Sequence, residues 1–218
     1  PLGSGADYVP AQIAEPNSVG TDEDIIILAP DAPLTDVKYT SVSWGSEARE
    51  DGARCTPTGD TLFRPPIPAD FVFYPPAGST PNAGLAVLMP DGRTIKQGQP
   101  FSRCYAGQPA TMTYYNSSSD VDIYGDGIEG AHGGSGLSAI GGTIRVGELT
   151  AGHIPHAVKI NLWAAQNLYY DAGDASPGYR WPARRADSYA AGNYGGSLPA
   201  LEMGALDVFV GNTPTTER

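Results

Sequence analysis

Glycine and proline interrupt this chain so often that it has little room for long helices. Its 218 residues include 28 glycines and 20 prolines, while charged residues make up only 17%. This composition is typical of many short strands joined by tight turns. All-β domains of about 200–250 residues commonly fold as one unit. We therefore predict an all-β fold, a single β-sandwich or jelly-roll domain with long loops and at most one or two short helices.

The predicted domain spans residues 25–212 and is flanked by irregular segments. Residues 1–4 resemble the remnant of a protease-cleaved affinity tag, 5–24 form an extended N-terminal arm, and 213–218 are a polar tail. Alternating or short apolar runs predict the strands, and the Pro-Asp-Gly sequence at residues 90–92 predicts a hairpin turn. The expected strands cover residues 25–29, 36–44, 71–74, 85–89, 94–96, 101–105, 110–115, 156–163 and 206–210, with one short helix between 137 and 149.

The charge of the chain excludes two classes of partner. Its formal net charge is −11. Nucleic acids and anionic membrane surfaces are bound through clustered Lys and Arg, so neither is expected. No apolar run approaches the roughly 20 residues that a membrane span needs. No sequence motif indicates a cofactor.

Two cysteines, Cys55 and Cys104, are the only ones in the chain. An even count is consistent with one disulfide, which would close a loop of about 50 residues and contribute roughly 4 kcal/mol. The alternative is a pair of buried free thiols. We expect the disulfide, and with it a secreted or cell-surface protein.

A glycine-rich stretch over residues 125–147 is the most unusual part of the sequence. So many glycines in one loop cost backbone entropy, so the structure should require them. One reason would be close approach of the backbone to a ligand. The other would be tight packing of the loop under a neighbouring sheet. The sequence leaves both open.

Four residues in and after this stretch are candidates for acid–base chemistry: His132, Glu148, His156 and Asp187. A glycoside hydrolase needs two carboxyl groups about 5–10 Å apart. A polysaccharide lyase instead needs a basic group and a residue that moves a proton. In the alternative interpretation, His156 is a structural histidine bonded to the backbone. The His153 and His156 spacing does not fit helical zinc ligands, so no metal is expected.

Basic and aromatic residues gather in the same half of this acidic chain. Aromatic faces pack against sugar rings, and guanidinium groups bind carboxylates and hydroxyls. The alternative is that Trp181 fills a core and the arginines pair with surface acids. The candidates for substrate binding are Arg145, Lys159, Trp181, Arg185 and Tyr189.

Three short segments of the C-terminal half form a pattern. They are the run from Gly136 to Leu149, the Ile-Pro-His-Ala sequence at 154–157, and the Trp-Pro-Ala sequence at 181–183, which is followed by Asp187. The pattern resembles a group of secreted bacterial proteins of unassigned activity that share "GLSxLGGxIRxxEL…IxHAL…WPA…D". The resemblance implies that Arg145, Glu148, His156 and Asp187 belong to the shared motif, and that further chain follows Leu206. The group lacks a histidine at the position of His132. At the level of the fold, the chain also resembles jelly-roll polysaccharide lyases.

Together these features predict a secreted carbohydrate-active protein. We expect it to bind a polysaccharide or oligosaccharide and to cleave it by carboxylate and histidine acid–base catalysis, as a glycoside hydrolase or a polysaccharide lyase. The alternative is a non-catalytic carbohydrate-binding or adhesion module of a surface protein. A structural domain of an exported assembly is a third possibility.

Overall fold

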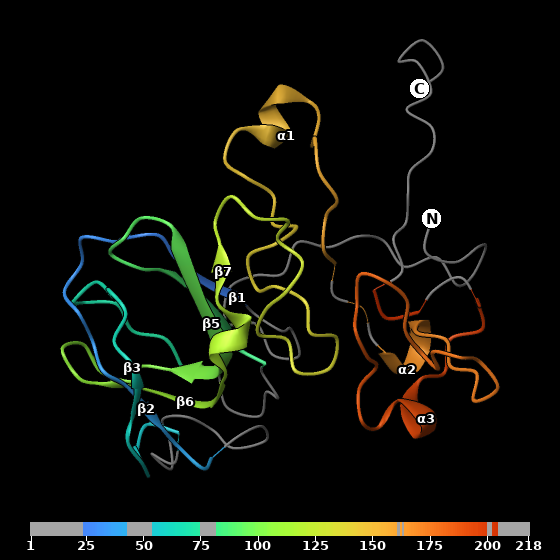
Figure 1. The fold of residues 1–218 in the computed structure, drawn as a ribbon, viewed down its shortest axis with the longest axis horizontal. Helices are drawn as coiled ribbons and strands as arrows, with labels where there is room; N and C mark the ends of the chain where they lie inside the picture. Colours follow the sequence, from blue (N-terminus) through green and yellow to red (C-terminus); the bar gives the residue numbers. More distant parts are fainter. Residues whose placement is uncertain are drawn as a thin grey trace. The chain divides into compact units, whose positions relative to one another are not determined.

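The computed structural model describes residues 24–42, 54–74, 82–160, 162, 164–199 and 202–204. The chain divides into two compact units, Pro1–Asn161 and Leu162–Arg218, which we describe separately (Figure 1). The boundary between them falls within residues 25–212, the stretch predicted as one domain. The predicted tag remnant, the polar tail and the strand at 206–210 lie outside the described residues, as does the predicted arm except for its last residue, Asp24.

The N-terminal unit is built on one seven-stranded mixed sheet. Its strand order is β1-β4-β5-β6-β2-β3, with β7 paired to β5. The pairs β1–β4 and β2–β6 are parallel, and the others are antiparallel. The strands are β1 (Asp24–Ile27), β2 (Val37–Tyr39), β3 (Thr61–Phe63), β4 (Gly84–Leu88), β5 (Thr94–Ser102), β6 (Ala110–Tyr115) and β7 (Val121–Asp122), and the 3-10 turn η2 covers Ser117–Ser119.

Strand β4 is buried on both faces of the sheet, which explains its uninterrupted apolar sequence. Leu85 and Val87 belong to the larger core cluster. Ala86 and Leu88 point to the opposite face, where they pack with Ile95 and with Ala139 of the glycine-rich loop. The alternation follows from the two-residue period of a strand. One face therefore carries the main core and the other carries the loop that holds the candidate site.

The hairpin predicted at residues 90–92 is present between β4 and β5. Asp91 accepts hydrogen bonds from the backbone N–H groups of Arg93 at 2.9 Å and Thr94 at 2.8 Å. Gly92 adopts a φ of 67°, in the left-handed region that favours glycine. These local contacts turn the chain back on itself and set the register of β5.

The Cys55–Cys104 disulfide is present, with Cα atoms 5.7 Å apart. It joins the segment before β3 to the residues that follow β5. A stable disulfide indicates an oxidising compartment outside the cytoplasm.

Strands dominate the described residues and the helices are short, so the all-β prediction is confirmed, although three short helices are present where at most two were predicted. They are α1 (Glu148–Ala151), α2 (Ala164–Asn167) and α3 (Ala190–Asn193), each of four residues. Of the predicted helix between residues 137 and 149, only the start of α1 is helical.

The strand predicted at residues 156–163 is wrong over the part that the structure describes, 156–160 and 162. Val158 and Ile160 alternate with polar residues but are exposed. The alternation therefore has no core to face, and the segment stays irregular.

The C-terminal unit is mainly turns around a small apolar cluster. Leu168, Ala190 and Tyr194 form the centre of this cluster. One isolated bridge pairs Tyr179 with Met203. The remaining described residues of this unit form turns and loops, most of them between α2 and α3.

Candidate functional site

The glycine-rich loop is fastened to the sheet by Gln97 of β5, a fully buried side chain. Its Oε1 accepts hydrogen bonds from the Ala139 backbone N–H at 2.8 Å and the Ser138 hydroxyl at 3.2 Å. Its Nε2 donates to the carbonyl oxygen of Glu129 at 3.1 Å. Because both ends of the amide hold the loop, the loop has a defined position on the sheet face.

Packing accounts for the key glycines of this loop. A Cβ at Gly130 would lie 2.5 Å from Ser138 Cα and would also overlap the Gln97 amide. A Cβ at Gly141 would overlap the carbonyl of Gly127. Gly142 combines a φ of 77° with a Cβ position 2.6 Å from the backbone nitrogen of Lys159. Of the two reasons that the sequence left open, close packing therefore has direct geometric support.

Three ionisable side chains from distant parts of the chain meet at the edge strand β1; we call Asp24, His132 and Lys159 the edge cluster. Lys159 Nζ donates to Asp24 Oδ2 at 2.6 Å and lies 3.1 Å from His132 Nε2. His132 Nε2 lies 3.0 Å from Asp24 Oδ1. The side chains are only 14–17% exposed. His132, a predicted acid–base candidate, is therefore enclosed by Asp24 and Lys159 and is not openly exposed to solvent.

The sheet leaves room for the edge cluster at Gly84. A Cβ there would lie 2.7 Å from Asp24 Oδ1. Burial opposes ionisation of Asp24, but the neighbouring His132 and Lys159 outweigh it and hold the pKa of Asp24 below its usual value. The cluster is thus a compact, charged site with an ionised carboxylate at its centre.

A second polar contact lies in the loop between Gly142 and Lys159, which we call the α1 loop. Figure 1 shows α1 on a stretch of chain that extends away from the strands. Both carboxylate oxygens of Glu148 lie 3.1 Å from His156 Nε2, and Oε2 also accepts the Arg145 N–H at 2.7 Å. The structure therefore brings together three residues of the predicted motif.

The hydrogen bonds of this pair limit its chemistry. His156 Nδ1 lies 2.8 Å from the carbonyl oxygen of Ala157, which can only accept. The Arg145 N–H lowers the pKa of Glu148, burial acts in the opposite direction, and His156 lowers it further. Both imidazole nitrogens thus face acceptors, so His156 must release one contact before it can take a proton from a substrate.

The α1 loop carries apolar side chains on its outside and polar contacts within. Val146 is fully exposed and Leu149 is largely exposed. The loop closes at its base through the Lys159 N–H, which donates to the Gly142 carbonyl at 3.0 Å. The conformation of the loop is therefore fixed by the Glu148–His156 contact within it and the Lys159–Asp24 contact at its base, and not by an apolar core.

The remaining predicted site residues belong to the C-terminal unit. Trp181 is 68% exposed and Tyr189 is 55% exposed, and Arg185 is exposed as well. Trp181 therefore does not fill a core. Asp187 accepts a hydrogen bond from the Tyr194 hydroxyl at 2.8 Å.

The backbone next to Trp181 is fixed by charged contacts. Arg180 binds Asp174 at 2.5 Å and Glu202 at 2.8 Å. The backbone N–H of Arg180 also donates to the Met203 carbonyl at 2.8 Å. Trp181 thus projects into solvent from an anchored segment.

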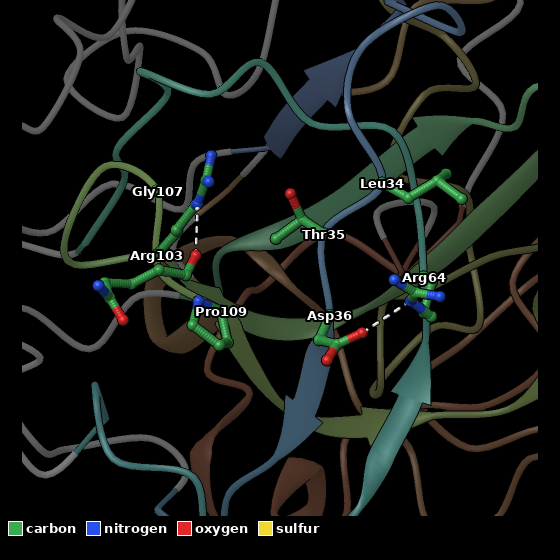
Figure 2. A pocket seen from close by; sticks show the side chains of 8 residues that line it. Leu34, Thr35, Asp36, Arg64, Arg103, Gly107 and Pro109 are labelled. Atoms are coloured by element: carbon green, nitrogen blue, oxygen red, sulfur yellow. Dashed lines mark hydrogen bonds and ion pairs between the residues drawn. The ribbon is translucent and has the colours of Figure 1, made fainter.

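A shallow pocket of about 180 Å³ lies in the N-terminal unit, and none of the predicted site residues lines it. Figure 2 shows Asp36 and Arg64 joined on one side of it, at 2.8 Å, and Arg103 on the other. The buried Arg103 donates to three backbone carbonyls, those of Gln108, Pro68 and Phe71. Arg103 therefore has a clear structural role beside this pocket.

Sequence reasoning missed Asp24. It was assigned to an irregular arm, and its partner Lys159 lies 135 positions away. A single acid before an apolar strand gives no signal of such a contact.

Among the residues that the structure describes, no group of three or more His, Cys, Asp or Glu side chains could hold a metal ion. Over the same residues, no helix has the length and apolar character to cross a membrane. Comparison with protein-family models, curated proteins and solved structures finds no match to this chain.

Proposed function

We propose that this chain is exported and binds an extracellular polysaccharide through the exposed aromatic segment 181–189 of its C-terminal unit. The observation that carries the proposal is the 68% exposure of Trp181. Burying a large apolar side chain stabilises a fold by about 2–3 kcal/mol, and this fold forgoes that gain. An indole face held in solvent is available to stack on a sugar ring.

Two further observations support binding at this segment. Arg180 ties the adjacent backbone to Asp174 and Glu202, so little ordering is needed when a ligand binds. Tyr189 and Arg185 are exposed within eight positions of Trp181, in a chain that is otherwise strongly acidic. Aromatic and guanidinium groups close in sequence suit a ligand that has both apolar ring faces and polar or acidic substituents. The disulfide supports export.

Affinity electrophoresis of the full chain in gels that contain neutral or uronic-acid polysaccharides tests the proposal. We expect retardation by at least one glycan, and about tenfold weaker binding by Trp181→Ala, the change that a loss of roughly 1.4 kcal/mol produces. Tyr124→Ala is the matched control, because Tyr124 is an 82% exposed aromatic residue of the other unit. Retardation by no glycan, or equal loss in both variants, would contradict the proposal.

Cleavage of the glycan is our second candidate function, and the contact between Glu148 and His156 favours it. An ionised carboxylate that orients an imidazole is the arrangement of a general base. His156 would exchange its Glu148 or Ala157 contact for the substrate when the glycan binds. Release of reducing ends, or absorbance of an unsaturated uronate product, would report hydrolysis or elimination. Equal product formation by wild type and Glu148→Gln, or none by either, would exclude this role.

A further inference from the structure

The edge cluster has a hydrogen-bond pattern that depends on one proton. The Lys159 ammonium has three N–H donors and three acceptors around it. These acceptors are Asp24 Oδ2 at 2.6 Å, the Ser138 carbonyl at 2.6 Å and His132 Nε2 at 3.1 Å. His132 can accept from Lys159 only if Nε2 carries a lone pair. The pattern is therefore complete for Lys159 when this nitrogen bears no proton.

The same pattern leaves one acceptor unused. Asp24 Oδ1 is buried and accepts no hydrogen bond, although His132 Nε2 lies only 3.0 Å away. An ionised oxygen without a donor is costly in a buried position. A proton on Nε2 would give this oxygen a donor, at the expense of the Lys159 contact. The imidazole thus stands between two mutually exclusive hydrogen bonds.

We infer that the edge cluster is a pH-sensitive tether for the α1 loop, in which protonation of His132 transfers its Nε2 contact from Lys159 to Asp24. The added proton fills the Nε2 lone pair, and one Lys159 N–H loses its acceptor. Two cations then face each other at 3.1 Å beside a single carboxylate. Acidification therefore loosens Lys159 and the base of the loop that it anchors.

The groups around His132 leave little to compensate for the new charge. Strand β1 contributes Asp24, and the end of the α1 loop contributes Lys159, whose ammonium also donates to the neutral Ser138 carbonyl of the glycine-rich loop. Strand β4 contributes Gly84, which has no side chain. The charge sum of Asp24, His132 and Lys159 rises from zero to +1 in a mostly buried position. Charge that is not paired is disfavoured there.

The backbone amide of Lys159 is the natural reporter, because it closes the base of the loop on the Gly142 carbonyl. Hydrogen exchange of the full chain, followed from pH 8 to pH 5 and corrected for the intrinsic pH dependence of exchange, measures its protection. We expect about tenfold lower protection at pH 5 in the wild type. In His132→Gln, protection should be independent of pH. Wild-type protection that does not change, or an equal loss in His132→Gln, would overturn the inference.

His156 is a second imidazole that contacts a carboxylate in the α1 loop, that of Glu148, so His156→Gln is the matched control. It should retain the pH response at Lys159 and alter only the exchange near Glu148. Should His132→Gln fail to fold, NMR of the wild type decides the matter. The His132 ring nitrogens and the Lys159 amide should then titrate with one midpoint. Separate midpoints, or a Lys159 amide that follows His156, would refute the tether.

Discussion

The Glu148 carboxylate holds the His156 imidazole with both oxygens at 3.1 Å, across seven intervening residues of an otherwise exposed loop. The contact closes the middle of the α1 loop, while Lys159 closes its base. Two residues that the sequence marked for acid–base chemistry are thus brought together. In this structure their contact is also what shapes the loop.

The stability of the α1 loop should depend on the charge of Glu148. Its pKa is lowered in the folded chain, chiefly by the Arg145 N–H. The contribution is therefore fully present above the ordinary carboxyl pKa of 4.5 and is lost as the pH falls through the lower folded value. Hydrogen exchange at Arg145 between pH 5 and pH 2 should show this loss in the wild type. Glu148→Gln should lack the pH step; a step of the same size would count against the contact.

Replacing Gly130 with alanine should destabilise the N-terminal unit by about 1–3 kcal/mol, the usual cost of overpacking. The new methyl would meet the backbone at Ser138 Cα, which cannot move aside as a flexible side chain would. Urea unfolding measures the change. Gly192→Ala is the control, because a Cβ there meets nothing within 4 Å. Equal midpoints for Gly130→Ala and wild type would mean that this glycine serves another purpose.

Replacing the fully buried Gln97 with methionine should cost about 2–3 kcal/mol, because buried backbone groups of the loop would lose their partners. The Ala139 N–H and the Glu129 carbonyl are the groups affected. We expect a lower unfolding midpoint and faster hydrogen exchange at Ala139. Gln108→Met is the control, because it changes an exposed amide and should have little effect. Lys96→Met would not serve, since Lys96 pairs with Asp120. An unaltered Ala139 exchange rate in the Gln97 variant would argue against the anchor.

Local sequence signals predicted the parts of the fold that depend on near neighbours. The short apolar run at residues 25–29 predicted β1, the strand expected at 110–115 is β6, and the Pro-Asp-Gly turn predicted the β4–β5 hairpin. The disulfide followed from the cysteine count. The jelly-roll arrangement and the resemblance to secreted bacterial proteins remain predictions.

Prediction from the sequence was wrong or incomplete where a strand or a site contact depends on residues that are distant in the chain. Val158 and Ile160 alternate as in a strand, yet no strand pairs with them among the described residues. Asp24 gained its importance only from Lys159 and His132. Glu148 and His156 could be paired because they lie close in sequence. Asp187 instead bonds to Tyr194 in the C-terminal unit, a contact that the shared pattern did not indicate.

Reduction of the Cys55–Cys104 disulfide should lower stability by roughly 4 kcal/mol, on the chain-entropy estimate for a loop of this length. The bond joins residues separated by 49 positions. Denaturant unfolding with and without a reductant gives the difference, and the Cys55→Ala, Cys104→Ala double variant should match the reduced protein. A double variant as stable as the oxidised wild type would contradict this expectation.

The most direct test of glycan binding is the indole N–H resonance of Trp181 during titration with an oligosaccharide of a retarding polysaccharide. Trp181→Phe assigns this resonance among the three tryptophans of the chain. We predict a saturable shift of the Trp181 signal with the other two indole signals unchanged. A Trp181 signal that stays fixed while the oligosaccharide binds elsewhere on the chain would contradict the account.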